Sequence, residues 1–207
     1  MNLTKKRYKL KKFYAPMGHV FVKMHMSPNV ITLLSLAFGL TSAYFFYIHK
    51  PLTAVSFLII SGFLDLMDGV VARLEDKASK FGAAFDWIAD KTVDGFILGS
   101  IGFAYGSPFI AISAITFSML HTFIKPVVYA EIGFSERQKG KIDDPLEGIG
   151  FFGRPETHIS IVFFSILERI NPVFGLHLGI KLIVLFTFGS LLIRILYLLK
   201  KYGKDYE

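Results

Sequence analysis

Apolar residues run through this chain in long blocks that short polar or charged stretches separate. Hydrophobic residues make up 53% of the 207 residues and charged residues only 19%, whereas a soluble domain carries about 25% charged residues. A helix that spans a bilayer needs about 20 mostly apolar residues. Six segments reach or approach that length: 29–48, 51–73, 81–103, 108–129, 154–167 and 178–199. The pattern therefore predicts an all-α polytopic membrane protein with six transmembrane helices.

The N-terminal residues follow a different pattern, in which Lys and Arg alternate with Tyr, Leu and Phe between positions 5 and 14. Such interleaving is typical of an amphipathic helix that lies on a membrane surface. We therefore expect one membrane domain over 1–207, with an interfacial segment at 1–24 and a six-helix bundle at 28–200.

Positive charge gathers at one end of the expected bundle. Most Lys and Arg lie in the N-terminal stretch, in the connections 74–80 and 131–153, and in the tail 200–207, while the other connections are short and nearly neutral. Cytoplasmic connections carry the excess of positive charge. With an even number of spans, both termini are then expected on the cytoplasmic side of the cell membrane. The formal net charge of +7 is an orientation signal on this view, and nucleic acid is not an expected partner.

Four aspartates stand inside this apolar sequence. Asp65 and Asp68 are three residues apart, and Asp86 and Asp90 are four apart, so each pair lies on one face of a helix. Ionised carboxylates are costly at membrane depth, and four of them around one point repel one another unless divalent cations lie between them. The spacing therefore predicts a metal site. The structural alternative is a buried ion network that only joins two helices.

The residues around these aspartates form a longer pattern. Positions 65–90 have the pattern Asp-x2-Asp-Gly-x2-Ala-Arg-x8-Gly-x3-Asp-x3-Asp. It resembles the signature of the CDP-alcohol phosphotransferase family without a gap or a substitution. The Ser-Pro-Asn-Val-Ile-Thr stretch at 27–32 and the six-span layout are also similar to the family. The layout most resembles members with a phosphorylated polyol acceptor, such as phosphatidylinositol phosphate and archaetidylinositol phosphate synthases.

The resemblance implies a membrane transferase of phospholipid biosynthesis, which moves a phosphoalcohol group from a CDP-linked lipid donor to the hydroxyl of a small polar acceptor and releases CMP. It implies two divalent ions, Mg²⁺ or Mn²⁺, and Asp90 as both ligand and general base. The implied metal ligands are Asp65, Asp68, Asp86 and Asp90. The implied donor-binding residues are Asn29, Thr32, Asp68, Gly69, Ala72, Arg73 and Gly82. Members of the family commonly form homodimers, so a second copy is an expected partner beside membrane lipid.

Three further cations lie in or near later spans: Lys125, Arg154 and Arg194. In family members with a phosphorylated inositol as acceptor, a lysine and two arginines from the same three helices bind its phosphate, so the resemblance implies an acceptor pocket here. The alternative is that Arg154 and Arg194 extend to the cytoplasmic interface.

Several alternatives stay open at this point. Glycerol 3-phosphate or serine as acceptor, or a soluble CDP-inositol donor, would use the same chemistry. A divalent-cation transporter would also have acids within its spans. Asp94 lies outside the signature, and we expect it to pair with Lys91 or another polar neighbour. His158 is expected to make a structural hydrogen bond, with contact to the acceptor as the alternative.

Overall fold

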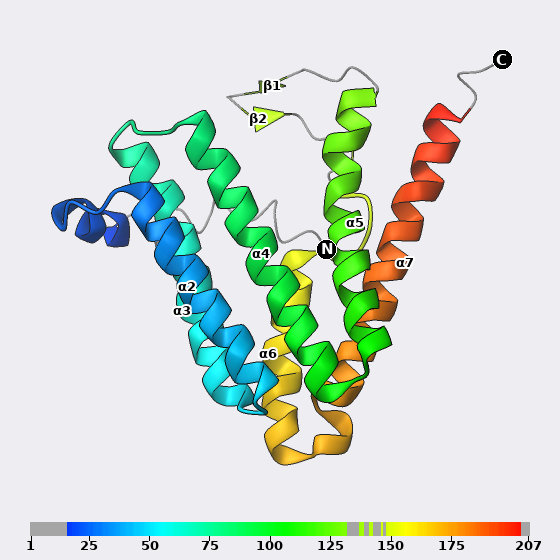
Figure 1. Ribbon diagram of the computed structural model, residues 1–207. Helices are drawn as coiled ribbons and strands as arrows, with labels where there is room; N and C mark the ends of the chain where they lie inside the picture. Colours follow the sequence, from blue (N-terminus) through cyan, green and yellow to red (C-terminus); the bar gives the residue numbers. More distant parts are fainter. Residues whose placement is uncertain (1–15, 132–136, 139–140, 143–145, 147, 204–207) are drawn as a thin grey trace.

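A computed structural model describes residues 16–131, 137–138, 141–142, 146 and 148–203 of the chain. These residues form six long helices (Figure 1). Their bounds are α2, Pro28–Tyr47; α3, Pro51–Leu74; α4, Lys80–Tyr105; α5, Pro108–Glu131; α6, Arg154–Ile170; and α7, Leu176–Tyr202. A 3-10 turn, η2 (Pro172–Phe174), precedes α7, and the two-residue strands β1 (Arg137–Gln138) and β2 (Lys141–Ile142) pair antiparallel. The described chain is thus almost wholly helical, as predicted, and each long helix starts within two residues of its expected start.

Residues 16–23 are helical as well. This short helix packs on α3, where the rings of Phe21 and Phe63 lie 6.3 Å apart. Most of the expected interfacial segment, residues 1–15, lies outside the described residues, so its amphipathic character stays a prediction.

Prolines and capping groups explain where the helices begin. Pro28, Pro51 and Pro155 each lie in the first turn of a helix, where the missing N–H costs nothing and the fixed φ suits the helix. At the start of α4, Ser79 Oγ accepts a hydrogen bond of 2.9 Å from the backbone N–H of Gly82, which satisfies one of the unpaired donors of the first turn.

Four of these segments are long and apolar enough to cross a membrane: α2, α3, α5, and α7 together with η2. The α4 helix has the expected length but carries the aspartates, and α6 has 17 residues. Large apolar side chains lie exposed on the outer surface, among them Ile59, Phe109 and Leu196, which suits contact with lipid tails. The apolar helices support a membrane location, and the crossing of α4 and α6 is part of the function proposed below.

Helices α2 and α3 are joined by serine side chains as well as by apolar packing. Ser35 Oγ donates to the Ser61 carbonyl and Ser61 Oγ donates to the Ser35 carbonyl, both at 2.8 Å. Ser42 Oγ donates to the Ala54 carbonyl at 2.8 Å. Small hydroxyl residues allow such close approach between helices in a membrane. These bonds fix the register of α2 against α3.

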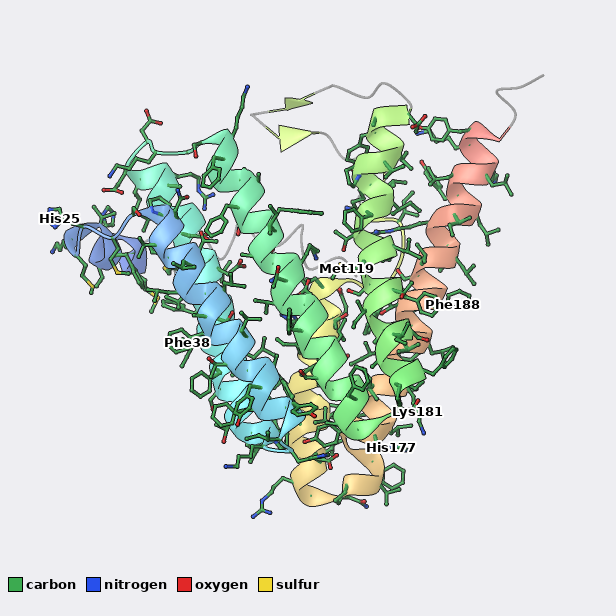
Figure 2. The ribbon with its side chains drawn as sticks, viewed as in Figure 1. His25, Phe38, Met119, His177, Lys181 and Phe188 are labelled. Carbon is green, nitrogen blue, oxygen red and sulfur yellow. The ribbon has the colours of Figure 1, made fainter. Side chains whose placement is uncertain are left out.

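Polar contacts join α4 and α7 at one end of the bundle. Figure 2 shows His177 and Lys181 at the end away from β1 and β2. His177 Nδ1 lies 2.7 Å from the Tyr105 carbonyl, and Lys181 Nζ lies 2.8 Å from His177 Nε2. These contacts tie the start of α7 to the end of α4. The apolar core between the ends includes the fully buried Phe46, Ile97 and Ile180.

Close packing between α4 and α5 depends on Gly102. A Cβ at this position would collide with the backbone of Ala111. We predict that Gly102→Leu lowers the free energy of unfolding by about 1–3 kcal/mol or more, because an overpacked site forces the backbones apart. The melting temperature in detergent measures this loss.

Gly62→Ala is the matched control. A Cβ at Gly62 meets nothing within 4 Å, and alanine favours a helix more than glycine does. This variant should melt at the same or a higher temperature. A Gly102→Leu protein as stable as the control would contradict the assigned α4–α5 packing.

Candidate active site

Three of the four predicted metal-ligating aspartates meet between α3 and α4. Asp65, Asp86 and Asp90 each offer a carboxylate oxygen, and these oxygens all lie within 4.8 Å of one another. All three side chains are half-buried. Since Mg²⁺ and Mn²⁺ prefer oxygen ligands, the donor set fits a divalent cation. The two carboxylate faces expected from the spacing do meet.

Asp68 lies deeper in the same region. It is 4% exposed, and Thr32 Oγ1 of α2 donates a hydrogen bond of 2.5 Å to Asp68 Oδ2. One oxygen of this carboxylate is thus bound by the protein itself. A third helix, α2, thereby joins the acidic cluster.

The residues predicted to bind the donor gather near the starts of α2 and α4. A Cβ on Gly82 would lie 3.4 Å from Asn29 Oδ1, so these two residues are neighbours. Arg73 is exposed near the end of α3, and its guanidinium lies beside Gly69. Ala72 is half-buried one position before it. The structure brings Asn29, Thr32, Asp68 and Gly82 to one end of the bundle, while their role in binding a donor stays a prediction.

Arg154, the first residue of α6, contacts the acidic cluster. Its Nη1 lies 2.6 Å from Asp90 Oδ2 and 3.6 Å from Asp65 Oδ2. Its Nε donates to Asp94 Oδ1 at 3.1 Å. Arg154 therefore faces the bundle interior, which contradicts the alternative that it extends to the membrane interface.

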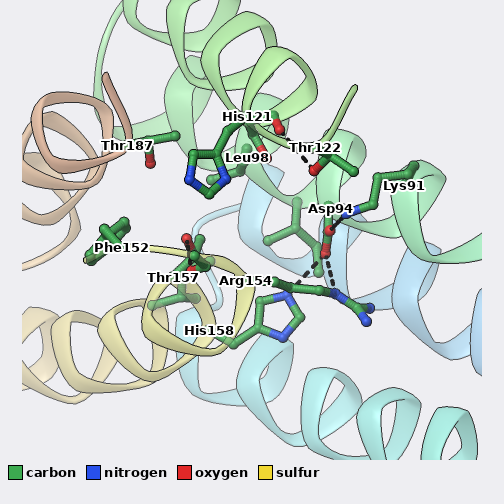
Figure 3. A pocket seen from close by; sticks show the side chains of 14 residues that line it. Lys91, Asp94, Leu98, His121, Thr122, Phe152, Arg154, Thr157, His158 and Thr187 are labelled. Atoms are coloured by element: carbon green, nitrogen blue, oxygen red, sulfur yellow. Dashed lines mark hydrogen bonds and ion pairs between the residues drawn. The ribbon is translucent and has the colours of Figure 1, made fainter. Parts of the chain in front are cut away.

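Asp94 has partners on two helices, as Figure 3 shows. Lys91 Nζ lies 2.8 Å from Asp94 Oδ2, and His158 Nε2 lies 3.1 Å from Asp94 Oδ1. The expected pairing with Lys91 is confirmed, and His158 makes the expected structural hydrogen bond. Together with Arg154 these side chains join α4 to α6.

A polar cavity of about 30 Å³ lies beside these ion pairs, between α4, α5, α6 and α7. Its wall includes Arg154, Asp94 and His158 at one side and His121 and Thr187 at another (Figure 3). A cavity of this size holds one or two water molecules.

Arg194 also points inward, from α7. Its Nη1 donates to the His121 carbonyl at 2.5 Å, and its Nε donates to the Ile149 carbonyl at 3.0 Å. Ser190 Oγ, one turn earlier, contacts His121 Nε2 at 3.1 Å and accepts a hydrogen bond from the Phe152 N–H at 3.4 Å. Arg194 is therefore not an interfacial residue, and it fixes the segment that leads into α6.

Lys125 is half-buried on α5, one turn after His121. Among the described residues, neither Lys125 nor Arg194 lines the cavity that Arg154 lines. The three cations predicted to bind one phosphate thus lie on three different helices, α5, α6 and α7, and Arg154 contacts Asp65 and Asp90 of the acidic cluster directly.

Comparison with known proteins identifies the family. The model of the CDP-alcohol phosphatidyltransferase family matches residues 25–187. The chain belongs to this family. Its members are phosphotransferases, and this membership gives no support to the cation-transporter alternative.

Curated relatives of this family member include transferases with different acceptors. Archaetidylinositol phosphate synthase of Pyrococcus horikoshii is 34% identical over 99 residues, which is 48% of this chain and 53% of the relative. CDP-diacylglycerol–serine O-phosphatidyltransferase of Mycobacterium tuberculosis is 37% identical over 75 residues, 36% of this chain and 26% of the relative. The matches thus span about half of the first relative and about a quarter of the second.

Solved structures share the fold along nearly the whole chain. Mycobacterium tuberculosis phosphatidylinositol phosphate synthase with CDP-DAG bound has a TM-score of 0.73 at 20% identity, covering 93% of this chain and 96% of that one. The same protein in complex with manganese and citrate has a TM-score of 0.71 at 19% identity, covering 87% and 86%. At these identities the likeness establishes the fold alone.

His121 is a site residue that the sequence argument did not use. It is 8% exposed, lines the cavity and contacts both Ser190 and Arg194. A histidine in the middle of an apolar span was the available signal, because ionisable residues within spans mostly face the bundle interior.

The hydrogen bond from Thr32 to Asp68 provides a test of how the buried carboxylate is held. We predict that Thr32→Val lowers the free energy of unfolding by about 1–3 kcal/mol, because it leaves a buried carboxylate oxygen without its donor. Thr32→Ser keeps the hydroxyl and should lose less. Equal melting temperatures for the valine and serine variants would contradict the assigned bond.

Proposed function

We propose that this family member transfers a phosphoalcohol group from a CDP-linked lipid donor to the hydroxyl of a small acceptor that carries a phosphate, and releases CMP. The observation that carries the proposal is the meeting of Asp65, Asp86 and Asp90 within 4.8 Å, with the half-buried Arg154 beside them. The same proposal includes one membrane domain over 1–207 whose six helices at 28–200 cross the membrane, both termini on the cytoplasmic side, and association into a homodimer.

The acidic cluster would hold one or two divalent cations, Mg²⁺ or Mn²⁺. Asp65, Asp86 and Asp90 would be the main ligands, with Asp68 contributing the oxygen that Thr32 does not bind. A bound cation would neutralise charge on the phosphate oxygens of the donor. The fold neighbour in complex with manganese supports a metal of this kind.

Each protein group then has a defined task. Asp90 accepts the proton of the acceptor hydroxyl, whose oxygen forms a bond to the phosphorus as the bond from phosphorus to the CMP oxygen breaks. Asn29, Gly82 and Arg73 are proposed to contact the donor. They lie near the starts of α2 and α4 and the end of α3, which supports this assignment. Small residues such as Gly69 and Ala72 leave room for the cytidine.

The acceptor side is where Arg154 lies. Its guanidinium touches Asp90, so a phosphate that it binds would bring the acceptor hydroxyl close to the base. Lys125 and Arg194 are proposed to add positive charge from α5 and α7. An inositol phosphate acceptor is supported by the relative named archaetidylinositol phosphate synthase. Serine is the second candidate, because relatives named as serine transferases match 36% of the chain.

A CMP-release screen tests the proposal. The purified protein is given a CDP-linked lipid with Mg²⁺ or Mn²⁺, and with inositol phosphate, glycerol 3-phosphate, serine or inositol in turn. We predict that CMP release requires the divalent cation and is fastest with inositol phosphate. CDP-inositol in place of the lipid is the donor control. Release that is fastest with serine or unphosphorylated inositol would overturn the phosphate-acceptor assignment.

The same screen separates the three cations. Alanine variants of Lys125, Arg154 and Arg194 should each raise the acceptor KM if the three side chains share one phosphate. A rise for Arg154 alone would leave Lys125 and Arg194 outside the acceptor site.

The role of Asp90 needs its own variant. We predict that Asp90→Asn reduces CMP release by about 10²–10⁴-fold, because the amide cannot accept the proton, while the melting temperature stays near that of the wild type. Asp76→Asn, which changes an exposed acid in the α3–α4 connection, is the matched control and should keep full activity. Full activity in Asp90→Asn would exclude Asp90 as the base.

A further inference from the structure

Two pairs of polar side chains join α4 to α6. Asp90 and Asp94 are one turn apart on α4, and Arg154 and His158 are one turn apart on α6. Arg154 reaches both acids, whereas His158 reaches Asp94. These side chains therefore link the two helices at two levels one turn apart, and Figure 3 shows the contacts of Asp94 with Arg154 and His158.

The carboxylate of Asp94 is held in place at both of its oxygens. It is 5% exposed, and its Oδ1 is contacted by both Arg154 Nε and His158 Nε2, each at 3.1 Å. Its Oδ2 is contacted by Lys91 Nζ at 2.8 Å. A carboxylate held at both oxygens by side chains of two helices cannot turn without breaking one of these contacts.

This fixed carboxylate determines how Arg154 meets Asp90. The guanidinium is a planar, rigid group, and Asp94 holds it at Nε while Nη1 lies against Asp90. An arginine commonly binds a single carboxylate through two nitrogens at once. With Nε engaged by Asp94, the edge formed by Nε and Nη2 cannot pair with Asp90, which Arg154 contacts through Nη1.

We propose that Asp94 is a positioning residue that holds Arg154 by its Nε atom and so keeps Asp90 available to a divalent cation. This inference rests on the proposed function, because it takes the acidic cluster as a cation site. Without the Asp94 carboxylate, Arg154 is free to pair with Asp90 through two nitrogens, and it then competes with the cation for the same oxygens.

Binding of Mn²⁺ to the substrate-free protein tests this inference apart from catalysis. Electron paramagnetic resonance of the unbound ion gives the Kd. We predict that Asp94→Asn raises the Kd about tenfold and Asp94→Glu about threefold, within the range of coupling between neighbouring charged groups. Arg154→Gln should lower the Kd, because it removes a cation from the cluster.

A double-mutant cycle decides whether Asp94 acts through Arg154. In the Arg154→Gln background, Asp94→Asn and Asp94→Glu should each change the Kd by less than about twofold. An equal weakening in both backgrounds would mean that Asp94 acts only through its charge, and it would overturn the positioning role. If Asp94→Asn does not fold, the Asp94→Glu pair of measurements decides the question in the same way.

Glu168→Gln is the matched control for losing a partly buried carboxylate. Glu168 lies near the other end of α6, where its Oε2 accepts a hydrogen bond of 2.7 Å from the Leu176 N–H. This variant should lower the melting temperature and leave the Kd for Mn²⁺ unchanged. Wild-type protein that binds no Mn²⁺ would overturn the proposed cation site itself, whereas wild-type binding that Asp94→Asn leaves unchanged would overturn the inference about Asp94 alone.

Discussion

Electrostatic repulsion among the aspartates gathered between α3, α4 and α6 is the main constraint on this site. Asp65, Asp86 and Asp90 come together within 4.8 Å, and Asp68 and Asp94 lie on the same two helices. Lys91 and Arg154 make close ion pairs in this region. Charges repel strongly where the dielectric is low, and buried ion pairs rarely recover the full cost of losing water. Three carboxylate oxygens this close together suit a divalent cation.

Short-range features of the site were predictable, whereas contacts between distant segments were not. The spacing of Asp86 and Asp90 fixed their common helix face, and the prolines marked the helix starts. The contact of Arg154 with Asp90 joins residues 64 positions apart. The periodicity of a helix predicts neighbours within one helix, so it could not predict a contact between α4 and α6. The bond from Thr32 to Asp68 depends likewise on how α2 lies against α3, which hydropathy does not determine.

Side chains of α7 position the start of α6 by holding the segment that precedes it. Arg194 and Ser190 hold the backbone at Ile149 and Phe152, just before Arg154 begins the helix. Gly150 lies between them at φ 93°, and a Cβ there would meet Ser190 Oγ at 2.5 Å. Only glycine suits both this backbone conformation and this close contact. Arg154 thus owes its position partly to the hydrogen bonds of Arg194 and Ser190 on α7.

The serine bonds between α2 and α3 have a mechanical consequence. Ser35 and Ser61 each donate to the other's backbone, so α2 and α3 form one rigid helix pair. This pair carries Thr32, Asp65 and Asp68. Helix α6, by contrast, is attached to α4 through the long side chains of Arg154 and His158. If the site widens to admit a bulky molecule, α6 should therefore move while the α2–α3 pair stays in place.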